Sequence, residues 1–187
     1  MTSAPYDISD KVSIKCNNLL MPKKKGLGLT TVSNVSLFDL SVDASFTHEE
    51  RETLRSFHIP EASVTSYDRM ICNNMMRHSR TYSWQGEKSF DRAVFLNDGS
   101  FGVIERILHF EETESVFVIL RGIEIDQNAG IVIRETNKTL SNVKVCHFYP
   151  FGALAWINAN RIVENCVVMK VPPRMYVAAY HNIYEGG

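Results

Sequence analysis

Apolar and polar residues alternate through most of the second half of the chain. The run RAVFLNDGSFGVIERILHFEETESVFVILRGI, from Arg92 to Ile123, is rich in Val, Ile and Phe, a composition typical of strands. Asn97-Asp98-Gly99 divides it with residues that tolerate positive φ, as a tight hairpin turn requires. The same criteria predict strands near 92–96, 101–110, 115–123, 143–148, 154–157, 161–171 and 174–180. We expect a bulge or bend near Glu164-Asn165 in the longest of them.

The first half has a weaker pattern with one distinct helix signal. Thr47-His48-Glu49-Glu50 is a capping box, in which the threonine hydroxyl and a glutamate carboxylate satisfy free backbone N–H groups, and Pro60 ends the helix. Two strands joined at Asn73-Asn74 are predicted within 67–84, and 32–42 and 12–16 are expected to be extended. The polar link 124–142 is expected to be a loop with a short strand at 131–133.

This succession of short strands and turns predicts a mainly β fold, a partly open barrel with a short helix and an N-terminal extension. The extension covers residues 1–62 and holds a basic loop and the short helix, while the β-domain covers 63–187. The length of 187 residues fits one domain with an ordered extension. Whether the chain is a whole protein or part of a larger one stays open.

Composition narrows the classes of function. The net charge of −1 gives no general attraction to nucleic acid. The chain has no apolar run of membrane-spanning length and no signal peptide, which predicts an intracellular location and no membrane partner. Four widely spaced cysteines (Cys16, Cys72, Cys146 and Cys166) match no zinc spacing, so we expect free thiols, no metal and no cofactor.

The sequence contains no recognised catalytic motif. Cys146 or Cys166 could be paired with His109 or His181, but among four cysteines and six histidines such pairs arise by chance. We therefore expect a protein that is not an enzyme, with an enzyme or metal protein kept as an alternative.

Several of these segments resemble a known family. Phe101–Ile107, Val116–Arg121, Ile162–Val168 and Met175–Val177 resemble successive strands of the bromo-adjacent homology (BAH) domain of chromatin proteins. His78–Tyr82, Arg92–Leu96 and Asp98–Ile104 resemble the C-terminal region of transposon-derived animal proteins. The resemblances cover residues 67–187 well and the first 60 loosely.

The resemblance implies a BAH/SH3-like barrel and a nuclear interaction module, associated with chromatin or a transposase, that binds a protein segment such as a histone tail. The implied binding residues are aromatic, since aromatic cages hold methylated ammonium groups by cation–π attraction. They are Tyr82, Trp84, Tyr149 and Trp156. The chain has no aromatic residue directly after the strand that ends at Gly122, where methyl-lysine-reading members carry one.

Two alternatives remain open. The first is a nucleic-acid-binding accessory domain of a transposase-derived protein, in which basic side chains contact phosphates. Its residues would be Lys23, Lys24, Lys25, Arg77, Arg80 and Arg92. The second is a structural dimerisation domain, and the oligomeric state is not predicted.

Overall fold

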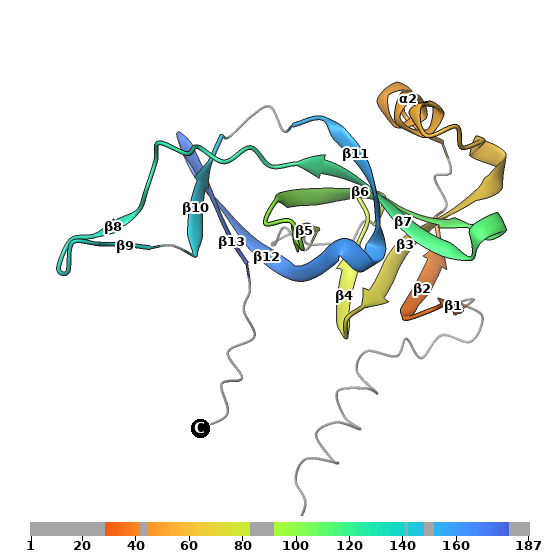
Figure 1. The fold of residues 1–187 in the computed structure, drawn as a ribbon, viewed down its shortest axis with the longest axis horizontal. Coiled ribbons are helices and arrows are strands. Elements are labelled where there is room, and N and C mark those ends of the chain that lie inside the picture. The colour runs from red at the N-terminus through yellow and green to blue at the C-terminus, as the bar shows by residue number, and fades with distance from the viewer. Residues whose placement is uncertain (1–28, 42–44, 83–91, 141, 148–151, 180–187) are drawn as a thin grey trace, which may run out of the picture.

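Antiparallel strands make up most of the fold in the computed structural model, which describes residues 29–41, 45–82, 92–140, 142–147 and 152–179 (Figure 1). The first half contains β1 (Thr30–Val32), β2 (Val35–Leu40), α2 (His48–Ser56), η1 (Glu61–Ser63), β3 (Val64–Cys72), β4 (Met75–His78) and β5 (Ala93–Leu96). The second half contains β6 (Phe101–Phe110), η2 (Glu111–Thr113), β7 (Ser115–Gly122), β8 (Val132–Ile133), β9 (Lys138–Thr139), β10 (Val143–Cys146), β11 (Leu154–Asn158), η3 (Ala159–Arg161), β12 (Ile162–Val171) and β13 (Arg174–Ala179).

The main sheet runs in the order β1-β2-β3-β6-β5-β12-β13-β10. On the other edge of β6 the sheet continues through β7 to β11, and β4 pairs with β3. The predicted mainly β class is therefore confirmed. The strands that the structure describes are not closed into a barrel, because only the isolated bridge between Ile125 and Cys146 links the segment after β7 to β10.

Local signals account for the turns. Asn73 and Asn74 both have positive φ, at 52° and 58°, and join β3 to β4 as predicted. Gly99, at φ 84°, lies in the turn between β5 and β6, where the Leu96 N–H donates to Ser100 O at 2.9 Å. The turn between β1 and β2, where Ser33 has φ 55°, was not predicted.

The predicted helix is confirmed together with its cap. The Thr47 side chain accepts from the Glu50 N–H at 3.2 Å, and the Glu50 carboxylate accepts from the Thr47 N–H at 2.7 Å. Within the predicted extension, β1 and β2 join the sheet through the β2–β3 ladder. The expected strand at 12–16 lies outside the described residues.

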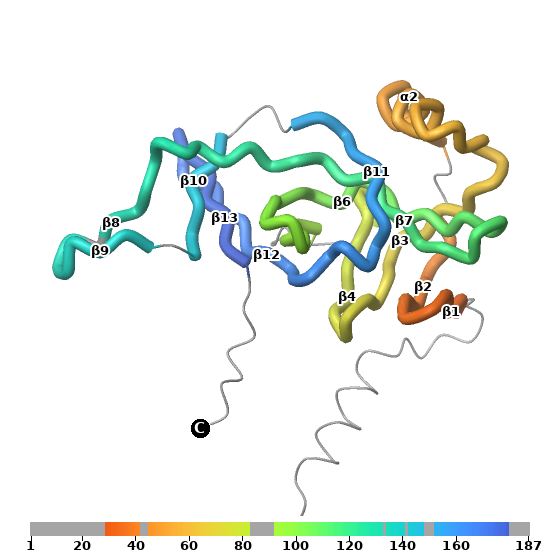
Figure 2. Tube along the Cα trace, in the orientation of Figure 1, coloured from red at the N-terminus to blue at the C-terminus, as the bar shows by residue number. Residues whose placement is uncertain are grey.

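Apolar side chains form three buried clusters. The principal one lies between β2, β3, β5, β6, β7, β11 and β12, and a second joins β5 and β6 to β10, β12 and β13. A third lies under α2, where Phe46 and Leu54 meet Leu108 of β6 and Ile119 of β7. The curved sheet thus carries its main core on one face and α2 on the other (Figures 1 and 2). None of the helices in the described part of the chain is long and apolar enough to cross a membrane.

Gly102 permits the closest approach of β6 to β7. A Cβ atom at this position would lie 2.0 Å from Leu120 Cδ2 and 3.1 Å from the carbonyl oxygen of Arg121. Leu120 is buried in the principal core cluster, so a shift of its side chain would disturb the packing around it. We therefore predict that Gly102→Ala lowers the free energy of unfolding by about 1–3 kcal/mol, as overpacking a core does. Urea denaturation would measure this, with Gly130→Ala, whose Cβ would meet only ordinary contacts, as the control. Equal stability of the two variants would contradict the prediction.

Candidate protein-binding surface

A buried ion pair fixes α2 on the sheet. Glu50, in the first turn of α2, is 2% exposed and Arg106 of β6 is 1% exposed, with 3.2 Å between Oε1 of the glutamate and Nε of the arginine. The same guanidinium donates to the carbonyl of Ser45 and lies 5.2 Å from the ring centre of Phe46. Glu50 therefore has two tasks, since one carboxylate caps the helix and neutralises a buried arginine.

Further ion pairs surround the N-terminal end of α2. Arg80 Nε lies 3.0 Å from Glu105 Oε2, and Arg121 Nη2 lies 2.7 Å from Glu49 Oε2. The hydrogen bond from Arg121 lowers the pKa of Glu49, and the same contact raises the pKa of Arg121. These side chains line an open cleft of about 490 Å³ together with Thr47 and His48.

The charges of this network of ion pairs, which lies in and under the cleft, balance one another. Glu49, Glu50 and Glu105 face Arg80, Arg106 and Arg121 in one network of ion pairs. An incoming anion would have to compete with carboxylates that already occupy the guanidinium groups. The cleft therefore serves to hold α2 against β6 and β7, and its chemistry does not indicate an anion site.

Three aromatic side chains meet at the C-terminal end of α2, and we call them the aromatic cluster (Phe57, Phe117 and Trp156). Trp156 of β11 stacks on Phe117 of β7, with ring centres 4.9 Å apart, and lies 6.2 Å from Phe57. Phe57 is 50% exposed, while Phe117 and Trp156 are half-buried. On its inner side the cluster continues into the buried residues under α2. It is thus anchored in the core and still open to solvent.

The strand that carries Trp156 is also an edge. In the described chain β11 pairs with β7 alone, in the register Leu154 to Arg121 through Asn158 to Phe117. Edge strands leave backbone N–H and C=O groups unpaired with a neighbour. The surface at β11 therefore combines half-exposed aromatic rings with backbone hydrogen-bonding groups.

Of the four predicted aromatic residues the structure describes two, and these two have different ring partners. Trp156 belongs to the aromatic cluster, whereas Tyr82 stacks on His78 at 4.6 Å and lies 5.2 Å from the guanidinium of Arg69. Trp84 and Tyr149 lie outside the described residues. Phe57 and Phe117 were not predicted from the sequence. Two sequence features could have indicated them: the alternation along β7 places Phe117 on the same face as Ile119, and Phe57 directly follows α2.

The three described arginines among the predicted phosphate contacts are engaged within the protein. Arg77 is fully buried, donates from Nη1 to the carbonyls of Cys72 and Met75, and has no hydrogen-bond partner among the described residues for Nε and Nη2. Burial lowers the pKa of this arginine. Arg80 is paired with Glu50 and Glu105, and Arg92 donates to the carbonyl of Ile104 at 3.4 Å. Lys23, Lys24 and Lys25 lie outside the described residues.

The described cysteines are buried thiols. Cys146 donates to the carbonyl of Met175 at 3.3 Å, and Cys72 to that of Ala159 at 3.7 Å. Burial raises the pKa of Cys146 to about 11 and that of Cys166 to about 12. Such thiols stay protonated at neutral pH and are poor nucleophiles. Over the ranges that the structure describes, no group of three or more His, Cys, Asp or Glu side chains could hold a metal ion.

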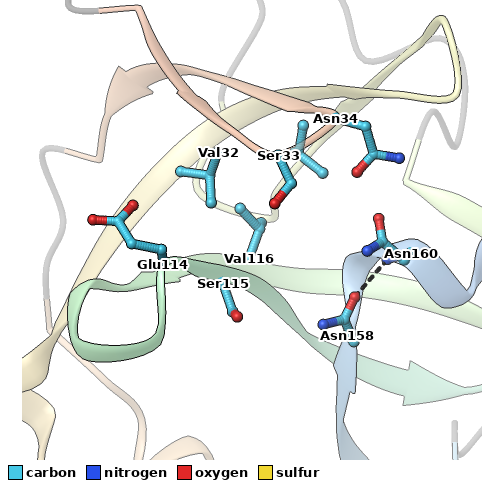
Figure 3. Close-up of a pocket in the computed structure, with 9 residues that line it drawn as sticks. Val32, Ser33, Asn34, Glu114, Ser115, Val116, Asn158 and Asn160 are labelled. Carbon is cyan, nitrogen blue, oxygen red and sulfur yellow. Dashed lines mark hydrogen bonds between the residues drawn. The ribbon is translucent and has the colours of Figure 1, made fainter.

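A small polar hollow lies between the β1–β2 turn, the start of β7 and the end of β11 (Figure 3). Its volume is about 30 Å³, and polar side chains such as Asn34, Glu114 and Asn158 line it. In Figure 3 the Asn158 side chain accepts a hydrogen bond from the Asn160 N–H, at 2.9 Å. A space of this size has room for about one water molecule, so it is too small for an organic ligand.

Comparison with known proteins gave no match to this chain among family models, curated proteins or solved structures.

The buried thiols give a prediction about reactivity and pH. In a Cys16→Ser variant, we expect Cys72, Cys146 and Cys166 to resist a thiol reagent at pH 8 until the protein is denatured. Because the pKa values of these thiols in the folded protein lie above the ordinary 9.0, the stability that they contribute is complete below pH 9. It is lost as pH rises through the folded pKa values, which are about 11 for Cys146 and about 12 for Cys166. Labelling followed by peptide mass spectrometry measures the first effect, and denaturation between pH 8 and 11 the second. Rapid labelling of Cys166 in the native protein would contradict the account.

Proposed function

We propose that this protein is a non-catalytic interaction module that binds a segment of another protein at the aromatic cluster. The observation that carries the proposal is the partial exposure of the Trp156 ring of β11 and of the two rings that contact it, Phe117 of β7 and Phe57 at the C-terminal end of α2. Aromatic side chains are enriched at the centres of protein interfaces and supply much of the binding free energy there. A cluster already packed against the core loses little side-chain entropy on binding.

The unpaired edge of β11 suits the binding of an extended partner segment. A strand with one unpaired edge can accept a peptide through main-chain hydrogen bonds, while neighbouring pockets receive alternate side chains. At this edge Trp156 lies beside Phe117 and Phe57. An apolar side chain of the bound segment would contact these rings, and its backbone would lie along Leu154–Asn158.

We also propose that the domain is BAH-like and works in the nucleus, in association with chromatin or a transposase. The segments that carry the resemblance support this proposal, since Phe101–Ile107 lies in β6, Val116–Arg121 in β7, Ile162–Val168 in β12 and Met175–Val177 in β13. A histone tail is then the first partner to examine. Direct nucleic-acid binding is less well supported, because Arg77 is buried and Arg80 is neutralised by two carboxylates.

Trp156 provides a direct reporter of binding. The chain has two tryptophans, so Trp84→Phe leaves Trp156 as the single tryptophan. We predict that histone-tail peptides, with or without methylated lysine, change its fluorescence on titration. Phe57→Ala in the same background should weaken binding about fivefold or more, since truncating a central aromatic side chain costs over 1 kcal/mol.

The matched control is Leu40→Ala, because Leu40 is also exposed, at 60%, and lies on β2 away from the cluster. It should leave the affinity unchanged. Equal affinities of the Phe57→Ala and Leu40→Ala variants would contradict the proposed site. A Trp156 signal that appears only with nucleic acid and collapses with added salt would contradict the proposed class of partner.

A further inference from the structure

A β-hairpin projects from the body of the protein, and we call it the arm (residues 131–140). β8 and β9 form a separate two-stranded sheet, closed by a hydrogen bond of 2.9 Å from the Leu140 N–H to the carbonyl of Ile131. Figures 1 and 2 show it extending beyond β10 and β13. Val132 on the arm is 50% exposed, and every residue of its turn, 134–137, is exposed. An isolated hairpin has little stability in water, so this one gains by packing against another surface.

An apolar surface without a described covering element lies on the sheet next to the arm, and we call it the β12–β13 face. Val167, Met169 and Val171 are exposed at 46%, 50% and 55% and follow one another at alternate positions of β12. Their cross-strand neighbours on β13 are Ala178, Tyr176 and Arg174. On β13 the residues between these neighbours, Met175 and Val177, lie on the other face of the sheet and are fully buried.

The edge of this face carries a charge that the Glu135 carboxylate of the arm complements, beside the exposed basic residues Arg134 and Lys138 of the same arm. Arg174 stands opposite Val171 and is exposed. Glu135, in the turn of the arm, is also exposed, and neither side chain forms an ion pair with another described residue. The arm therefore offers an apolar residue and a carboxylate three positions apart, and the face offers apolar residues that border a guanidinium.

We propose that the arm of one copy packs on the β12–β13 face of a second copy, with Val132 against Met169 and Val171 and with Glu135 paired to Arg174. In a twofold dimer each copy supplies one arm and one face, so the contact is made twice and the assembly closes. The arm precedes β10 in the chain, and β10 pairs with β13. The arm and the β12–β13 face therefore lie at the same end of the sheet.

This dimer is independent of the proposed binding function. The aromatic cluster lies on α2, β7 and β11, none of which contributes to the arm or to the β12–β13 face. Both binding surfaces of a dimer would therefore remain open. Two linked sites would raise the apparent affinity for a partner with repeated segments.

Sedimentation equilibrium of the full chain tests the proposal. We expect a mass of twice 21.3 kDa for the natural sequence and for the control Leu40→Asp, which alters an exposed apolar residue on β2. Val132→Asp on the arm and Met169→Glu on the face should each give the monomer mass, with unchanged circular dichroism because both side chains are exposed. A monomer at every concentration, or a dimer that survives either of these two substitutions, would overturn the proposal.

Charge exchange separates the specific contact from general apolar association. Glu135→Arg and Arg174→Glu should each weaken the dimer several-fold, because each places like charges together. The two substitutions in one chain restore the pair with its signs exchanged and should recover most of the affinity. If the double variant is as weak as the single ones, Glu135 does not meet Arg174 and the proposed arrangement is refuted.

Discussion

The buried ion pair between Glu50 and Arg106 determines how the helix and the sheet fit together. Two charges with almost no exposed surface are costly to remove from water, and this cost is offset only when each has close, well-directed partners. Here the carboxylate meets the guanidinium and the capped backbone, and the guanidinium also meets a backbone carbonyl and an aromatic ring. Loss of one partner from such a pair costs about 3–5 kcal/mol, a large part of the stability of a small domain.

The candidate binding surface follows from this constraint. With its first turn held at β6, α2 extends so that Leu54 enters the core and Phe57 comes beside Trp156 and Phe117. The aromatic cluster is therefore a tertiary feature, in which no two members are neighbours in sequence. The arm and the β12–β13 face have other origins. The arm is a hairpin that leaves the main sheet between β7 and β10. The face is exposed because no described element covers the outer side of the long strand β12.

Local chemistry explains which features were predictable. The capping box at Thr47, the turn at Asn73-Asn74 and the turn before Ser100 are each encoded within a few residues, and all three are present. The Ser33 turn was missed because serine carries only a weak preference for positive φ. The β12 irregularity was expected near Glu164-Asn165 and falls between Ile162 and Glu164. How far the partly open barrel would close could not be predicted, because strand number and alternation do not determine whether two edges pair.

Long-range contacts explain what was missed at the site. Glu50 was interpreted only as a capping residue, because its pairing with Arg106 depends on a fold that joins residues 56 positions apart. Arg77 was grouped with surface bases, and nothing in MMRHSR indicates that this side chain is buried. Trp156 was selected from its residue type alone. Its partner Phe117 follows only from the register of β11 on β7, and its partner Phe57 only from the position of α2 on the sheet.

Hydrogen exchange in a Glu50→Gln variant tests the central claim most directly. Glutamine at this position can still cap the helix, so the substitution removes the charge that Arg106 requires and retains the local signal. Glu52→Gln, on the exposed side of the same helix, is the matched control. The account predicts that amides of α2 lose at least about tenfold protection in the Glu50→Gln variant only, while β6 and β7 stay protected by their ladder. Equal protection of α2 in the two variants would show that the buried ion pair does not hold the helix on the sheet.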